Sequence, residues 1–244
     1  MSRSFGSAAS TYESGRPGYP VEAVSWMLEP ARQDDRALSV ADVGAGTGKL
    51  TREIVGLGAE VVAIDPDAAM LENLRGNVPG VPVFVGSAED LPLEDGSVDA
   101  VVMGQAWHWV DPDAASVEIA RVLRPGGILG LVWNIRDERV DWVRRLTEVM
   151  HGSNAEELLA GDGPRVAEPF AGLKERTWEW SHPMTLAALT DMMRSRSYVI
   201  TADPPVRARM EAEFARLFAD DAALQSGGTI DLPYRTHAFR TVRP

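Results

Sequence analysis

The sequence contains no cysteine, which excludes disulfide bonds, thiolate nucleophiles and cysteine-based zinc sites. It also has no run of about 18 apolar residues, so we expect no transmembrane helix. Residues 1–20 lack the apolar segment of a signal peptide. Together these absences predict a cytoplasmic protein that is not inserted in a membrane.

Basic residues are also scarce, because 24 Lys and Arg stand against 36 Asp and Glu and give a net charge of −12 at pH 7. Proteins that bind nucleic acids or anionic membranes need basic patches, and no run of Lys or Arg offers one. The four histidines are scattered, without the H-x-E or H-E-x-x-H spacing of a metal site. We therefore expect no nucleic acid, membrane or metal ion as a partner. The sequence indicates no particular oligomeric state.

What is present is a 244-residue chain with 45% apolar residues, enough to bury a sizeable core. In its first half, short apolar runs alternate with helical patterns. The apolar runs cover residues 38–43, 61–64, 81–85, 98–103 and 128–133, and the helical patterns cover 21–29, 49–57, 68–77 and 113–123. This alternation predicts a parallel α/β sheet with helices on both faces and a ligand site at the carboxyl ends of the strands.

The second half of the chain is less regular. Helical periodicity appears over residues 141–151, 186–194 and 206–218. Strand patterns appear over 176–181, where two tryptophans alternate with other residues, and over 236–242. Residues 154–169 are expected to form a loop.

The segment Asp42-Val43-Gly44-Ala45-Gly46-Thr47-Gly48 is the strongest local signal, because it follows a predicted strand and opens a predicted helix. Glycines there permit a tight turn and close approach of a ligand to the backbone. The dinucleotide fingerprint needs a third glycine where Lys49 stands, and a P-loop needs Ser or Thr after the lysine. Asp42 disfavours a pyrophosphate by charge repulsion. It favours a ligand with ammonium and sulfonium charges, as in S-adenosylmethionine.

Asp65 ends the second predicted strand, 21 residues after Gly44. An acidic residue there accepts hydrogen bonds from ribose hydroxyls in mononucleotide-binding folds; the alternative is that Asp65-Pro66-Asp67 only caps the next helix. After the third strand, residues 86–92 could line an adenine pocket, with Ser87 or Glu89 near the exocyclic amine, or form a plain surface loop.

With these residues in place, the chain resembles the class I S-adenosylmethionine-dependent methyltransferases. Four segments carry the resemblance in order and spacing: residues 40–48, 64–65, 86–92 and 122–127. Within that superfamily the chain is similar to the trans-aconitate-methyltransferase-like branch. This narrower resemblance is carried by residues 12–20, 105–109 and 231–236.

The resemblance implies a Rossmann-like, mostly parallel sheet of seven strands whose last strand is antiparallel, with a small helical cap. Residues 1–36 would form an N-terminal arm and lid helix, 37–136 the S-adenosylmethionine-binding core, and 137–244 the cap segments and remaining strands, all in one structural domain. The resemblance also implies that Asp65 holds the ribose, that Ala88 and Glu89 flank the adenine, and that Gly44, Gly46 and Gln105 lie along the methionine part. The other expected cofactor-binding residues are Asp42, Ala45 and Pro66, with Tyr12, Arg16 and Tyr19 in a lid.

The segment Gln105-Ala106-Trp107-His108-Trp109 ends the fourth strand and is where the acceptor should meet the methyl group. His108 could act as a general base, orient the acceptor, or be structural between the tryptophans. One of Trp107 and Trp109 is expected in the core, and the other could wall the acceptor pocket.

Two further residues, Arg196 and Tyr198, could face an acidic substrate, although charges near a helix C-terminus need no function. The resulting hypothesis is an enzyme that transfers a methyl group in-line to a small-molecule acceptor, with a carboxylic acid as one option. Two alternatives stay open at this point: a nicotinamide-dependent oxidoreductase and a non-catalytic nucleoside-binding module.

Overall fold

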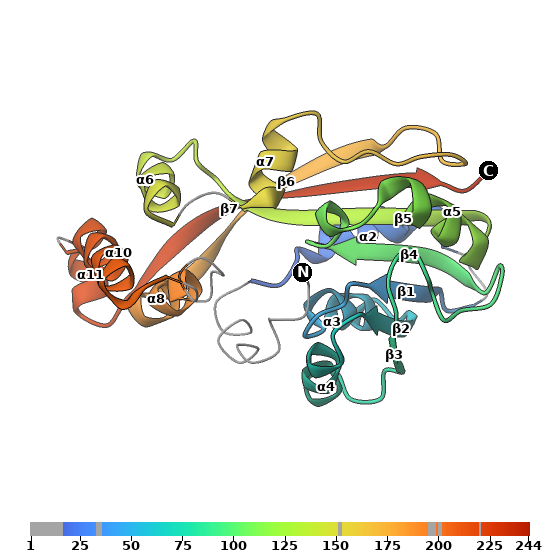
Figure 1. Ribbon diagram of the computed structural model, residues 1–244, viewed down its shortest axis with the longest axis horizontal. Helices are drawn as coiled ribbons and strands as arrows, with labels where there is room; N and C mark the ends of the chain where they lie inside the picture. Colours follow the sequence, from blue (N-terminus) through green and yellow to red (C-terminus); the bar gives the residue numbers. More distant parts are fainter. Residues whose placement is uncertain (1–16, 33–35, 151–152, 195–198, 200–201, 220) are drawn as a thin grey trace.

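The computed structural model of the chain (Figure 1) describes residues 17–32, 36–150, 153–194, 199, 202–219 and 221–244. Its centre is a seven-stranded sheet in the order β3-β2-β1-β4-β5-β7-β6. The strands are β1 (Ser39–Val43), β2 (Glu60–Asp65), β3 (Val83–Val85), β4 (Val98–Gly104), β5 (Leu123–Arg136), β6 (Lys174–Thr185) and β7 (Thr229–Val242). The first five run parallel, while β7 is antiparallel to both β5 and β6. The predicted fold class is therefore confirmed.

Helices cover both faces of this sheet because successive side chains of a strand point to opposite faces. On one face, Val40 and Val102 pack under α2 (Val21–Leu28) and α3 (Lys49–Gly56). On the same face α4 (Ala68–Asn77) packs on β2 and β3. The opposite face is covered by α5 (Pro112–Val122), the short η3 (Trp107–Trp109) and α7 (Asn154–Ala160).

A third group of buried apolar residues lies away from the sheet centre, in a helical cap. This cap is formed by α6 (Asp141–Met150), α8 (Leu186–Arg194), α10 (Pro204–Leu217) and α11 (Ala222–Gln225). Figure 1 shows β6 and β7 running out from the sheet into these helices. Met184 on β6 and Leu232 on β7 are buried there. The long strands β6 and β7 thus extend from the sheet into the cap.

The secondary structure differs from the sequence-based expectation mainly at residues 154–160, at the start of β7 and at both ends of β5, which runs from Leu123 to Arg136 instead of 128–133. Residues 154–160 form α7 instead of a loop, because Ser153 and Glu156 make a capping box that satisfies the first backbone N–H groups. Strand β7 begins at Thr229, seven residues before its predicted start at 236. Pro233 is tolerated within β7 because the pairing of β7 with β5 begins only at the next residue, Tyr234, so Pro233 need not donate a hydrogen bond to β5. No described helix has the length and apolar character needed to cross a membrane.

Candidate active site

A cleft of about 660 Å³ opens where the carboxyl ends of β1, β2, β4 and β5 meet. Its glycine-loop end is lined by the turn after β1 and the loops after β2 and β3: Asp42–Thr47, Asp65–Asp67 and Ser87–Glu89. Its cap end is lined by the last residue of β5, the start of α7 and two cap side chains: Arg136, Ser153–Glu156, Met192 and Tyr234. The segment after β4 lies between the two ends. This is the sheet edge at which the sequence predicts a ligand.

Three glycines of the loop, Gly44, Gly46 and Gly48, have left-handed backbone, and the first two line the cleft. Gly44 has φ 70° and Gly46 has φ 55°, a region that most side chains disfavour. The backbone N–H groups of Gly44 and Ala45 both donate to the carbonyl of Ile64, at 2.8 and 3.1 Å. A Cβ on Gly44 would lie 2.7 Å from the Cβ of Ala106. The turn is therefore pressed against the segment after β4, and Gly46 faces open space in the cleft.

Asp65 braces the glycine loop and does not cap the next helix. Its Oδ2 accepts a hydrogen bond from the N–H of Gly46 at 2.9 Å, and its Oδ1 accepts one from the N–H of Asp67 at 2.8 Å. The helix cap is Asp67, whose side chain accepts the N–H of Ala69 at 2.8 Å. Burial raises the pKa of the Asp65 carboxyl above its usual value. Since each carboxylate oxygen has two lone pairs, Asp65 can still accept hydrogen bonds from a ligand in the cleft.

Asp42 is fully buried under the same loop. The Oγ1 of Thr51 donates to its Oδ2 at 2.6 Å, while its Oδ1 accepts no hydrogen bond from any described residue. Burial is the main reason that the pKa of Asp42 rises to about 7, and the nearby charge of Asp65 adds to the shift. The cleft floor therefore holds two carboxyl groups whose ionisation a cationic ligand would stabilise.

The raised pKa of Asp42 predicts a pH-dependent stability. Between about pH 4 and pH 7 the folded protein keeps a proton that the unfolded chain has released, so the free energy of unfolding falls as pH rises through this window. Asp42→Asn removes this titration. We expect the stability of the variant relative to the native protein to increase from pH 5 to pH 8, as measured by urea unfolding. Asp141→Asn, at an exposed position, is the control for the loss of one charge. If the change in the free energy of unfolding has the same pH dependence in both variants, Asp42 does not titrate in this range.

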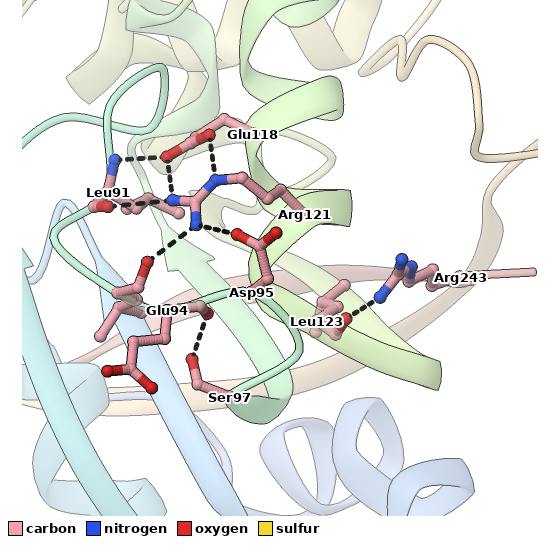
Figure 2. A network of polar contacts seen from close by, with 9 residues as sticks. Leu91, Glu94, Asp95, Ser97, Glu118, Arg121, Leu123 and Arg243 are labelled. Atoms are coloured by element: carbon pink, nitrogen blue, oxygen red, sulfur yellow. Dashed lines mark hydrogen bonds and ion pairs between the residues drawn. The ribbon is translucent and has the colours of Figure 1, made fainter.

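The loop after β3 contributes Ser87, Ala88 and Glu89 to the cleft, so it is more than a plain surface loop. Glu89 is oriented by the N–H of Asp111, which donates to its Oε1 at 3.0 Å. Beyond Glu89 the loop is anchored to α5, as Figure 2 shows, by Arg121.

Arg121 donates to the carbonyls of Leu91 at 3.1 Å and Leu93 at 2.8 Å. It also forms ion pairs with Glu118 at 2.6 Å and Asp95 at 2.7 Å. Glu118 in turn accepts the N–H of Leu91 at 2.8 Å, and its hydrogen bonds with Arg121 lower the pKa of its carboxyl. Arg121 thus fixes the loop that lines the cleft at Ser87–Glu89. The sequence patterns did not point to this residue, although it directly precedes the segment 122–127 that carries the family resemblance.

The segment after β4 has strained backbone at Gln105, a non-glycine residue with φ 55°. Two bonds to β5 hold it there: its N–H donates to the carbonyl of Val132 and its Nε2 to that of Asn134, both at 2.9 Å. The side chain of Asn134 donates to the carbonyl of Gly18 at 2.8 Å. This bond ties the residue before Tyr19 to the sheet, and Tyr19 lines the cleft over Gly104. Asn134 is a cleft residue that was not predicted from the sequence.

The two tryptophans of the predicted acceptor site lie in different places. Trp107 is buried in the core and its indole N–H donates to the carbonyl of Arg165 at 2.9 Å, so its side chain does not line the cleft. Trp109 lines the cleft with 61% of its surface exposed. His108 also lines the cleft, and its Nδ1 accepts the indole N–H of the buried Trp133 at 3.3 Å.

Several predicted residues lie outside the described part of the chain: Tyr12, Arg16, Arg196 and Tyr198. The structure places the other predicted cofactor-binding residues together along the cleft, including Ala45 and Pro66. Within the described ranges, no group of three or more His, Asp or Glu could hold a metal ion. The cap end contains two buried or half-buried charged residues that the sequence did not single out, Arg136 and Glu156.

Comparison with known proteins assigns this arrangement to a family. The family model described as a methyltransferase domain matches residues 41–131. An uncharacterized methyltransferase of Mycobacterium tuberculosis is 48% identical over 240 residues, which cover 98% of this chain and 96% of that protein. An uncharacterized methyltransferase-like protein of Schizosaccharomyces pombe is 32% identical over 243 residues, covering 97% of this chain and 94% of that protein.

A solved structure of similar fold comes from a proposed type II methyltransferase of Anaeromyxobacter dehalogenans. It has a TM-score of 0.63 at 24% identity and covers 93% of this chain and 98% of that one. Because the Mycobacterium tuberculosis methyltransferase is 48% identical over 98% of this chain, the chain belongs to the class I S-adenosylmethionine-dependent methyltransferases. It is an enzyme of that class, and neither the nicotinamide-dependent oxidoreductase nor the non-catalytic module is retained.

Proposed function

We propose that the glycine-loop end of the cleft holds S-adenosylmethionine and that the cap end holds a small-molecule methyl acceptor. The observation that carries this proposal is the pair of carboxyl groups under the glycine loop. Asp65 faces the cleft with lone pairs available for ribose hydroxyls, and the buried Oδ1 of Asp42 lacks a hydrogen bond within the described structure. Such a floor suits a cationic nucleoside and disfavours a diphosphate.

The residues around this floor fit the remaining parts of the cofactor. Ala88 and Glu89 would flank the adenine, while Gly44, Ala45, Gly46 and Gln105 would lie along the methionine part. Tyr19 and Pro66 complete the walls. When bound, S-adenosylmethionine supplies a methyl group already activated by its sulfonium. The protein's own contribution is to align the acceptor and to exclude water from the cleft.

Under this proposal His108 orients the acceptor and is not a general base. Because its Nδ1 accepts the indole N–H of Trp133, the neutral ring carries its proton on Nε2, and its Nδ1 does not face the acceptor as a base. A carboxylic acid would suit this arrangement, since a carboxylate needs no base to become a nucleophile. The branch that segments 12–20, 105–109 and 231–236 resemble is named for carboxylate substrates, but the identity of the acceptor does not carry over from that resemblance.

His108→Asn tests this role. We expect turnover to fall by up to about 100-fold through misplacement of the acceptor, while the Kd for S-adenosylhomocysteine stays within about twofold. The assay follows transfer of a labelled methyl group to a panel of small carboxylic acids, with ester formation as the readout. His182→Asn, a substitution outside the cleft, is the matched control. Full turnover in His108→Asn would leave His108 with a structural role only, and no transfer to any small molecule by the native protein would contradict the proposed function.

A further inference from the structure

Arg136 occupies an unusual position for a charged residue. It is the last residue of β5, it is only 3% exposed, and it lines the cap end of the cleft. Its Nε donates to the Oγ1 of Thr147 at 3.1 Å and its Nη2 donates to the Oε1 of Glu156 at 2.8 Å. Its Nη1 makes no hydrogen bond to any described residue. This atom is not fully buried, so a ligand in the cleft can reach it. A buried guanidinium with unused donors on a cleft wall can bind a ligand.

The surroundings of Arg136 limit the charge of that ligand. Glu156 is held in place from its other side, because its Oε2 accepts the backbone N–H of Ser153 at 2.6 Å and the Ser153 hydroxyl at 3.0 Å. Arg136 is the one Lys or Arg among the described residues that line the cap end. A dianionic phosphate would therefore face one guanidinium and a nearby carboxylate, whereas a single carboxylate matches the fork of Arg136.

Apolar side chains lie beside this polar spot. Met192 and the buried Tyr234 line the same end of the cleft, together with Ala155. Tyr234 is itself stacked on Trp180, with ring centroids 5.3 Å apart. A wall of this kind suits an apolar body that carries one anionic group.

We propose that Arg136 is the anchor for the acceptor and that the acceptor is a monocarboxylate with an apolar body, not a phosphate, an amine or a polycarboxylate. This inference rests on the function proposed above, since it assigns the acceptor to the cap end of the cleft. Arg136 supplies charge-assisted hydrogen bonds to the carboxylate, while Glu156 and Thr147 hold the guanidinium in place. The same pairing with Glu156 makes the site unfavourable for a second negative charge.

The test compares carboxylates with their neutral isosteres. Benzoate, cinnamate, hexanoate and octanoate are titrated beside their own carboxamides by ligand-observed NMR in the presence of S-adenosylhomocysteine. We expect at least one acid to bind the native protein at least about tenfold more tightly than its amide. Arg136→Lys keeps the positive charge but loses the paired N–H donors of the planar guanidinium, so the preference for the acid over its amide should decrease. Glu156→Gln frees Arg136 from a competing carboxylate, so acid binding should tighten.

A single loss of Arg136 would leave Glu156 as an unpaired buried charge and could unfold the protein. The double variant Arg136→Gln/Glu156→Gln removes both charges and should bind acid and amide equally. Equal binding by the native protein, better binding of hexylamine, or an undiminished acid preference in the double variant would overturn the proposal. The affinity for S-adenosylhomocysteine is measured in each variant. If the native protein binds S-adenosylhomocysteine but shows no preference for an acid over its amide, only the proposed role of Arg136 is wrong. If the native protein does not bind S-adenosylhomocysteine, the proposed function is wrong as well.

Discussion

Asp65→Ala is expected to weaken binding of S-adenosylhomocysteine by about 10- to 150-fold. This range corresponds to the loss of a charged hydrogen-bonding group worth about 1.5–3 kcal/mol. The substitution acts twice, because it removes the acceptor for the ribose and releases the N–H of Gly46 that the carboxylate holds at 2.9 Å. Isothermal titration calorimetry measures the change directly.

Asp67→Ala is the matched control for this experiment. Asp67 is a second carboxylate on the same rim, two residues away, but it serves as the cap of α4. Its loss should cost about 1 kcal/mol of stability and leave the affinity within about threefold. If both variants lose affinity equally, general negative charge on the rim is responsible and Asp65 has no specific role at the ribose. Unchanged affinity in Asp65→Ala would remove it from the binding site.

The second large effect is expected at the glycine loop, where Gly44→Ala should lower the free energy of unfolding by about 2–4 kcal/mol. One part of the cost is the left-handed backbone, with φ 70°. The other part is the contact of a new Cβ with Ala106 at 2.7 Å, which must push the segment after β4 out of place. Urea unfolding followed by circular dichroism measures the loss.

Gly46→Ala provides the comparison, because the two glycines share a backbone region but differ in surroundings. Gly46 has φ 55°, and a Cβ added there would have no atom within 4 Å and would face the cleft. We expect this variant to lose only the strain energy of about 1–2 kcal/mol but to bind S-adenosylhomocysteine at least about tenfold more weakly. Equal stability losses in the two variants would mean that the contact with Ala106 is relieved without cost.

Much of the fold could be predicted from the sequence because the first half has strongly periodic patterns. The buried strand β4, for example, is almost entirely apolar over Val98–Met103 and leaves little ambiguity. The loop assigned to residues 154–169 was wrong at its start, although Ser153-Asn154-Ala155-Glu156 carries the spacing of a capping box and could have indicated α7. The extension of β7 was harder to predict, because Pro233 normally argues against an internal strand.

The glycine-loop end of the cleft was also predictable, since its residues are close in sequence to strand ends. The cap end was not. The predicted fifth strand stopped at Trp133, whereas β5 continues to Arg136, so Asn134 and Arg136 were not placed at a strand end. Glu156 reaches Arg136 only through the docking of α7 on β5, a tertiary contact without a local sequence signal. The two tryptophans were expected to divide between core and cleft, and only their surroundings decide which is which.

We propose that the two carboxyl groups under the glycine turn make this cleft a site for a cationic nucleoside. Calorimetric titration of the purified protein with S-adenosylmethionine, S-adenosylhomocysteine and NADH tests it most directly. We expect saturable binding of both sulfur-containing nucleosides and no measurable binding of NADH. Tight binding of NADH, with neither of the two nucleosides bound, would contradict it.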